Sequence, residues 1–246
     1  MALLPRHPTT VRRGAGRPGT SCEASGRSAP GIVGILYGGA LAIAITLGGP
    51  LLLFNPWFTS ALQARHEVAA AFDTPQAEID GVTGEILVDL YLNGDFDASL
   101  TPGEPLLDER ERSHMGDVSR LVQLTAGITV AALVVAVITG AWLRHERRRQ
   151  GRIMITAAGV IGAIAVVLAG IFAVAFEAAF LAFHAIFFPA GTYLFSEGSQ
   201  LIVLFPQGFW FDASIAAGGT IVVTALVVAA IGFARWRGGS QPSAEA

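Results

Sequence analysis

Four long stretches without a charged residue constrain what this chain can fold into. They cover residues 31–54, 121–143, 153–176 and 213–234. About 20 apolar residues in a helix span the roughly 30 Å hydrocarbon core of a bilayer, and only helices or closed barrels satisfy the backbone there. None of the stretches shows the strict alternation of a barrel strand. We therefore predict an all-α polytopic membrane protein with four transmembrane helices.

The distribution of arginine predicts how these helices are oriented. Twelve of the 16 arginines lie in the two tails and in the connection between the second and third helices, and the chain has no lysine. Four crossings place these three regions on one side, which the positive-inside rule assigns to the cytoplasm. Residues 55–120 and 177–212 then lie outside, and the first of these segments has 13 acidic residues against four arginines.

The expected organisation is therefore a membrane domain between two cytoplasmic tails. Residues 1–30 are rich in Arg, Gly, Pro and Ser and read as a disordered tail. Residues 31–237 form the four-helix domain, and residues 238–246 form the second tail. The basic run 144–149 is interpreted as a topogenic element that meets lipid headgroups.

Composition excludes several classes of protein. The chain is 52% hydrophobic and only 14% charged, whereas soluble domains have about 25% charged residues. A net charge of −3 argues against a nucleic-acid binder, which needs a basic excess. A single cysteine, Cys22, excludes a disulfide framework or a thiolate metal cluster.

The first outer segment is expected to contain three helical pieces. Two are short, at residues 61–72 and 85–92. The third begins near Asp108, whose spacing to Glu111 fits a capping box, and continues into the second transmembrane helix. Residues 93–104 partly match a calcium-binding loop, but Ala and Pro at key positions favour a polar turn.

His114 is the first candidate functional residue. It precedes Arg120 by six residues, which places it about 9 Å above that residue, near the outer membrane face. Glu111 and Asp117 lie three residues to either side, so both can reach its helical face. A carboxylate there would orient the imidazole ring. The alternative is a solvated, charged helix with no catalytic role.

The second outer segment is unusually aromatic. Ten of the 15 phenylalanines lie between positions 172 and 211, a composition that suits a surface that handles acyl chains. His184 follows Glu177 by seven residues and shares its helical face. The apolar stretches 201–206 and 209–211 are too short to span, and suit an interfacial or re-entrant segment. An aromatic belt, with His184 as an ordinary interfacial residue, is the alternative.

Two histidines at the outer boundary permit two chemistries. One is general acid–base catalysis on a lipid ester. The other is a metal-dependent hydrolase, with Glu177 or Asp117 as further ligands. The sequence contains no His-Glu-x-x-His, Gly-x-Ser-x-Gly or phosphate-loop motif. A non-enzymatic accessory protein that grips a partner helix is the third reading.

Two motifs carry a family resemblance. Residues 111–118 read Glu-Arg-Ser-His-Met-Gly-Asp-Val, and residues 183–189 read Phe-His-Ala-Ile-Phe-Phe-Pro before Gly-Thr-Tyr-Leu-Phe. Together they resemble the lipoprotein intramolecular transacylase family of bacterial four-helix membrane proteins, over residues 31–237. The resemblance implies a multi-pass protein of the bacterial plasma membrane, with its active site at the outer leaflet.

The resemblance also implies an activity. The sn-2 acyl chain of a diacylated lipoprotein moves to the α-amine of its own N-terminal cysteine, without a cofactor or metal, and leaves a lyso-form lipoprotein. The implied partners are diacylated lipoproteins and membrane lipid, with no nucleic acid, and oligomeric state is left open. The implied catalytic residues are His114 and His184. The supporting candidates are Glu111, Asp117, Arg120, Glu177 and Tyr193.

Within that reaction we expect His184 to be the base that deprotonates the amine. His114, held by Asp117 or Glu111, would polarise the ester carbonyl and protonate the departing oxygen. Arg120 and Tyr193 are candidate donors to the oxyanion or the headgroup. The sequence does not decide which histidine is the base.

Overall fold

A computed structural model of the protein describes residues 29–238. The expected arginine-rich tail, including Cys22, lies almost wholly outside the described residues, as does the C-terminal tail beyond residue 238. The described chain is helical, in the order α1 (Ala29–Leu51), α2 (Pro56–Arg65), α3 (Val68–Ala71), α4 (Gln76–Leu92), α5 (Glu109–Trp142), a 3₁₀ turn η1 (Leu143–His145), α6 (Arg147–Phe187), α7 (Gln200–Leu204) and α8 (Gln207–Gly238).

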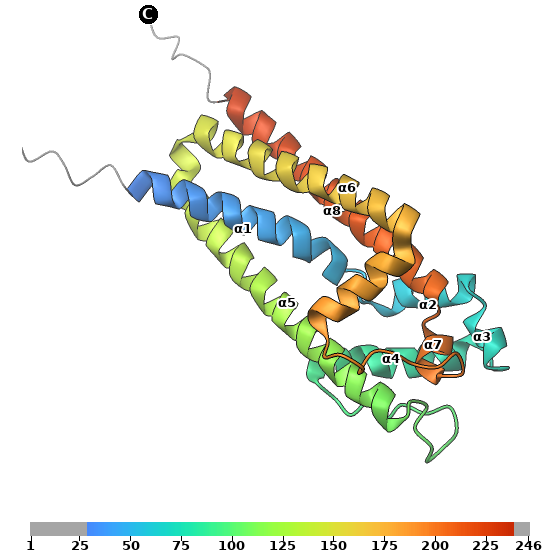
Figure 1. The fold of residues 1–246 in the computed structure, drawn as a ribbon. Coiled ribbons are helices and arrows are strands. Elements are labelled where there is room, and N and C mark those ends of the chain that lie inside the picture. Colours follow the sequence, from blue (N-terminus) through green and yellow to red (C-terminus); the bar gives the residue numbers. More distant parts are fainter. Residues whose placement is uncertain (1–28, 239–246) are drawn as a thin grey trace, which may run out of the picture.

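The long helices α1, α5, α6 and α8 form an elongated bundle (Figure 1). Each is long and apolar enough to cross a membrane. Their outward faces carry exposed apolar side chains, among them Ile35, Val137 and Val174, and lipid is the environment in which such faces are stable. The prediction of an all-α protein with four membrane-spanning helices is therefore confirmed.

The helices pair unevenly. Helix α6 packs mainly against α8, and α5 packs mainly against α1. At Gly151 of α6, an added Cβ atom would lie 2.4 Å from the carbonyl oxygen of Gly232 in α8. Because only glycine permits this approach, these two positions allow the α6 and α8 backbones to come into direct contact.

A buried polar cluster joins the bundle at the end where α1 begins and α8 stops. Gln150 of α6 donates to the Gly140 carbonyl oxygen at 3.0 Å and to the Tyr37 hydroxyl at 3.4 Å. Its own side-chain oxygen accepts from Arg235 at 2.6 Å. One side chain thus links all four long helices, and its polar atoms are satisfied despite burial.

The opposite end of the bundle is covered by the short-helix layer, which we define as α2, α3, α4, α7 and the segments that connect them (Figure 1). Its apolar core includes Val68, Ile79, Ile86, Phe96 and Leu204. Gln63 is fully buried at its centre, exchanges hydrogen bonds with Thr83 and donates to the Leu204 carbonyl oxygen at 3.2 Å. These contacts tie α2, α4 and α7 together.

Two helix boundaries in this layer differ from the sequence prediction. The expected helix 61–72 is broken, because Glu67 adopts a left-handed backbone conformation with φ 54° between α2 and α3. The break directs His66 toward α8, where its Nε2 lies 2.9 Å from an oxygen of Asp212. The expected helix 85–92 begins earlier, at Gln76, since burial of its apolar face offsets the low helix propensity of two glycines.

The remaining connections agree with the prediction. Asp108 and Glu111 form the expected capping box, each accepting at 2.8 Å from the backbone N–H of the other. Helix α5 then continues without a break into its apolar stretch. Residues 93–104 form a turn in which Phe96 and Ala98 are buried and Asp95 and Asp97 point outward.

Helix α6 is longer than its apolar stretch and is not straight. It begins at Arg147 and contains a kink at Ala175, where φ is −131° and ψ is 43°. Beyond the kink, its last turns bend across the bundle toward the start of α5 (Figure 1). This bend decides which residues meet at that end of the molecule.

Candidate active site

His114 lies in the second turn of α5 and is buried, with 6% of its surface exposed. The Phe188 ring packs edge-on against its imidazole at 4.9 Å between centroids, and the Phe195 ring lies at 5.5 Å. Its Nδ1 atom is buried without a hydrogen-bond partner in the described part of the chain. A buried polar atom without a partner is costly, so this atom is a candidate contact for a substrate group.

His184 lies beyond the kink, in the last turn of α6. Its Nδ1 is 2.8 Å from the carbonyl oxygen of Phe180, one helical turn earlier. A carbonyl oxygen only accepts hydrogen bonds, so Nδ1 carries the hydrogen. In the neutral ring Nε2 then holds the lone pair, which is the state that a general base requires.

The two imidazole rings face each other. Their centroids are 6.0 Å apart and their planes are inclined by 27°. Aromatic side chains surround them, and Phe188 contacts both rings. The enclosure, which we call the aromatic wall, consists of Phe180, Phe183, Phe188, Tyr193 and Phe195. Two proton-accepting groups in apolar surroundings suit acid–base chemistry on a lipid.

No carboxylate makes a hydrogen bond to His114 in the described residues. Glu111 is almost fully buried, at 1% exposed, but points elsewhere. Its side chain accepts hydrogen bonds from the backbone N–H of Asp108, from the Ser199 hydroxyl and from the backbone N–H of Leu201. Glu111 therefore fastens the start of α5 to α7 and the segment before it. The three-residue spacing could not predict Ser199 and Leu201 as partners, because they come from a distant part of the chain.

Asp117 and Arg120 pair with each other rather than hydrogen-bonding to His114. They form an ion pair with each other along α5, and Arg120 is 71% exposed. Within residues 29–238 neither makes a hydrogen bond to His114. The ion pair between Asp117 and Arg120, three residues apart, competes with the predicted contact between Asp117 and His114.

Glu177 and Tyr193 were the two supporting candidates expected near His184, and only Tyr193 lies beside it. The Tyr193 ring lies 5.3 Å from the imidazole of His184. Glu177, two residues beyond the kink, is exposed and makes no hydrogen bond or ion pair with another described residue. Seven residues of ideal helix would align Glu177 with His184, but no hydrogen bond forms between their side chains in the described chain.

Only part of the aromatic wall was predicted from the sequence. Tyr193 was a named candidate, and Phe183, Phe188 and Phe195 lie in the second motif or just after it, but Phe180 belonged only to a Phe-rich stretch. The four-residue spacing from Phe180 to His184 would have identified one neighbour, whereas Phe195 reaches His114 through a chain reversal after Pro189 that no local pattern predicts.

The metal-dependent alternative lacks a ligand set in the described chain. Between residues 29 and 238 no three side chains of His, Cys, Asp or Glu are grouped so that they could hold an ion. The two histidines lie together, but the carboxylates proposed as further ligands do not complete a ligand group with them in this part of the chain. Acid–base chemistry is therefore the reaction class that the described geometry favours.

Comparison with known proteins identifies the family. The profile of the family described as "Lipoprotein intramolecular transacylase Lit" matches residues 37–210, which is most of the chain. The protein therefore belongs to the lipoprotein intramolecular transacylase family, and it is a multi-pass membrane acyltransferase whose substrates are lipoproteins. No curated protein shows significant sequence similarity to it.

Solved structures show the same fold. The in meso structure of the membrane-integral transacylase Lit from Bacillus cereus superimposes with a TM-score of 0.75 at 17% identity, covering 84% of this chain and 95% of that one. A structure of the same protein with a histidine replaced by arginine gives a TM-score of 0.69 at 16% identity, covering 84% and 92%. The resemblance predicted from the sequence motifs is confirmed.

Proposed function

We propose that the protein transfers the sn-2 acyl chain of a diacylglyceryl lipoprotein to the α-amine of that lipoprotein's N-terminal cysteine. The product is an N-acylated, lyso-form lipoprotein. The observation that carries this proposal is the pair of imidazole rings, 6.0 Å apart, inside an aromatic wall at one end of a four-helix membrane bundle. The amine nucleophile needs a base, which a histidine can supply, and the lipid ester needs apolar surroundings, which the aromatic wall provides.

In the proposed reaction His184 is the base. The α-ammonium group has a pKa near 8, so the amine must shed a proton to act as a nucleophile. As its nitrogen attacks the sn-2 carbonyl carbon, Nε2 of His184 takes an N–H proton. The C–O bond to the glyceryl oxygen then breaks, and that oxygen receives the proton from His184. The ammonium form first loses one proton to solvent. From the neutral amine onward an ester bond is exchanged for an amide bond, and the proton that His184 takes from the nitrogen ends on the glyceryl oxygen.

His114 keeps the role of polarising the ester carbonyl, whereas the proton for the departing oxygen is assigned to His184. Without a carboxylate partner, the ring is best suited to act as a neutral hydrogen-bond donor to the ester carbonyl oxygen, where negative charge develops. Its unpartnered Nδ1 atom supports this assignment. Tyr193 is the second candidate donor, since its ring is beside His184.

The shape of the site suits a substrate with both lipid and peptide parts. A polar pocket of about 290 Å³ lies against Phe195 and is lined by Arg110, Ser196 and Gln200, among other residues. We propose that it receives the first residues of the lipoprotein polypeptide, while the acyl chains contact the aromatic wall. Holding amine and ester on one bound molecule provides the rate gain of an intramolecular reaction.

We further propose that this end of the bundle faces the outer leaflet. The other end holds the arginine-rich turn between α5 and α6 and the two arginines near the end of α8. Positively charged connections remain in the cytoplasm, so the histidine pair would face outward. The test replaces Cys22 by Ser, introduces single cysteines at residues 144 and 197, and labels them with a membrane-impermeant reagent. Only the second should react in intact cells.

The activity is tested by expressing the protein in a host that makes diacylated lipoproteins, followed by mass spectrometry of a lipoprotein N-terminal peptide. Wild-type protein should convert the free, diacylated cysteine into the N-acyl lyso form. His184→Ala should abolish conversion, and His145→Ala, an exposed histidine at the other end of the bundle, should not. A free fatty acid with an unmodified amine would indicate a hydrolase. Conversion that survives both His114→Ala and His184→Ala would contradict the site.

A further inference from the structure

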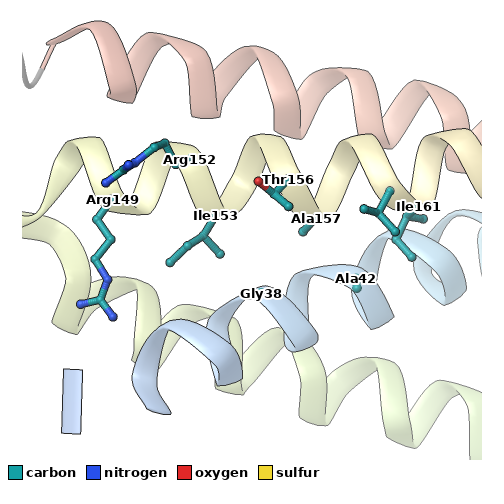
Figure 2. Close-up of a pocket in the computed structure, with 9 residues that line it drawn as sticks. Gly38, Ala42, Arg149, Arg152, Ile153, Thr156, Ala157 and Ile161 are labelled. Carbon is teal, nitrogen blue, oxygen red and sulfur yellow. The ribbon is translucent and has the colours of Figure 1, made fainter. Parts of the chain in front are cut away.

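A groove of about 560 Å³ lies between α1 and α6, near the end of the bundle away from the two histidines. Its lining is small or apolar along most of its length, with Gly38 and Ala42 on α1 facing Ile153, Ala157 and Ile161 on α6 (Figure 2). Pockets that bind small ligands have volumes of about 300–1,000 Å³, so the groove is large enough to hold an extended hydrocarbon chain.

The groove exists because two close contacts hold the helices together beside it. An added Cβ atom at Gly34 would lie 3.3 Å from Ile153, and one at Gly38 would lie 3.2 Å from the same side chain. Beyond these glycines α1 presents only the methyl group of Ala42. On α6, Val160 lines the groove and is 53% exposed, so the groove opens onto the bilayer rather than into the protein.

One end of the groove is cationic. Arg149 and Arg152 both line it at the start of α6 (Figure 2). Arg149 is paired with Glu146 at 2.8 Å, and its guanidinium reaches the backbone of α1 near Gly34. Arg152 is exposed and makes no hydrogen bond or ion pair with another residue of the described chain. A groove of hydrocarbon size thus leads to two guanidinium groups.

We propose that this groove binds one acyl chain of an anionic phospholipid, with its phosphate-bearing headgroup held by Arg152 and Arg149. Guanidinium groups bind phosphate oxygens through charge-assisted hydrogen bonds, and the apolar lining is exposed to the membrane, where phospholipid is the abundant occupant. The site is separate from the acyl-transfer site, because more than 20 residues of α6 lie between Ile161 and His184. It therefore does not depend on the proposed reaction.

The proposal is tested on the purified full chain in detergent. We expect phosphatidylglycerol to raise the thermal unfolding midpoint and to stay bound in native mass spectrometry, and phosphatidylcholine with the same acyl chains to do neither. Arg152→Gln should weaken phosphatidylglycerol binding about fivefold, the change that about 1 kcal/mol per arginine near an anionic lipid implies. Ala42→Phe should block the chain. Arg148→Gln, an exposed neighbour that does not line the groove, is the matched control.

Three results would overturn the proposal. Phosphatidylcholine could bind as well as phosphatidylglycerol, which would indicate unspecific lipid at the bundle surface. Inorganic phosphate alone could reproduce the whole thermal shift, which would leave no role for the acyl chain. Arg152→Gln could bind like Arg148→Gln. Arg152 is exposed, so its replacement leaves packing intact, and this variant decides the outcome even if Ala42→Phe fails to fold.

Discussion

The imidazole rings of His114 and His184 lie 6.0 Å apart, although α5 and α6, which carry them, make few other contacts with each other. Along the bundle α5 packs mainly against α1, and α6 packs mainly against α8. The kink at Ala175 redirects the last turns of α6 across the bundle to the start of α5. The histidine pair is thus created by a bend in one helix, and the Phe188 ring contacts both imidazoles.

The hydroxyl of Tyr193 is expected to contribute to acyl transfer. Tyr193→Phe removes this donor and keeps the ring that packs against His184. Loss of one donor to a developing oxyanion typically costs about 10²–10³ in rate, and we expect a decrease of at least about tenfold in lyso-lipoprotein formation at unchanged thermal stability. Full activity of this variant, together with loss of activity in Tyr193→Ala, would show that only the ring matters.

Phe188 is expected to matter for both stability and activity. It is 7% exposed and contacts both imidazole rings. Phe188→Ala leaves a cavity that costs about 3–5 kcal/mol and frees the histidines to move apart, so unfolding temperature and activity should both fall. The neighbouring Phe187 is 50% exposed and serves as the control: Phe187→Ala should retain both. Equal effects of the two changes would contradict a role for Phe188 in the pair.

Glu111 is expected to be a positioning residue rather than a catalytic one. Glu111→Gln loses a charged acceptor from a side chain that accepts from Asp108, Ser199 and Leu201. Leaving one of these buried donors unsatisfied costs about 1–3 kcal/mol, measurable as a lower unfolding temperature. Activity should fall mainly through a raised KM, since the segment before α7, which Glu111 holds through Ser199, borders the polar pocket. Glu109→Gln, on the exposed face of the same turn, should behave like wild type.

The contact between Gly151 and Gly232 predicts opposite effects of two similar substitutions. Gly151→Ala places a methyl group 2.4 Å from a backbone oxygen, and overpacking of this kind costs about 1–3 kcal/mol. Gly159 lies on the same helix, and an added Cβ atom there has nothing within 4 Å. Gly159→Ala should therefore stabilise the protein by up to about 1 kcal/mol through helix propensity. Thermal unfolding of both variants in one detergent measures the difference.

Features that depend on neighbours along the chain could be predicted from the sequence. Four uncharged stretches define four spanning helices, because a lipid environment requires each segment to satisfy its own backbone. The capping box at Asp108 needs only residues three positions apart. The motifs around His114 and His184 were sufficient to identify the family, and both histidines do lie in one site.

The partners of those residues could not be predicted, because they come from distant segments. Glu111 lies at a suitable spacing to reach His114, yet Ser199 and Leu201 compete for its carboxylate and prevail once α7 packs beside α5. The groove with Arg149 and Arg152 at its end likewise requires α1 and α6 to lie together. The sequence by itself determined that the chain crosses a membrane four times as helices. Only the tertiary structure decided which side chains meet, because a bend at Ala175 and the packing of the short-helix layer depend on contacts between remote parts of the chain.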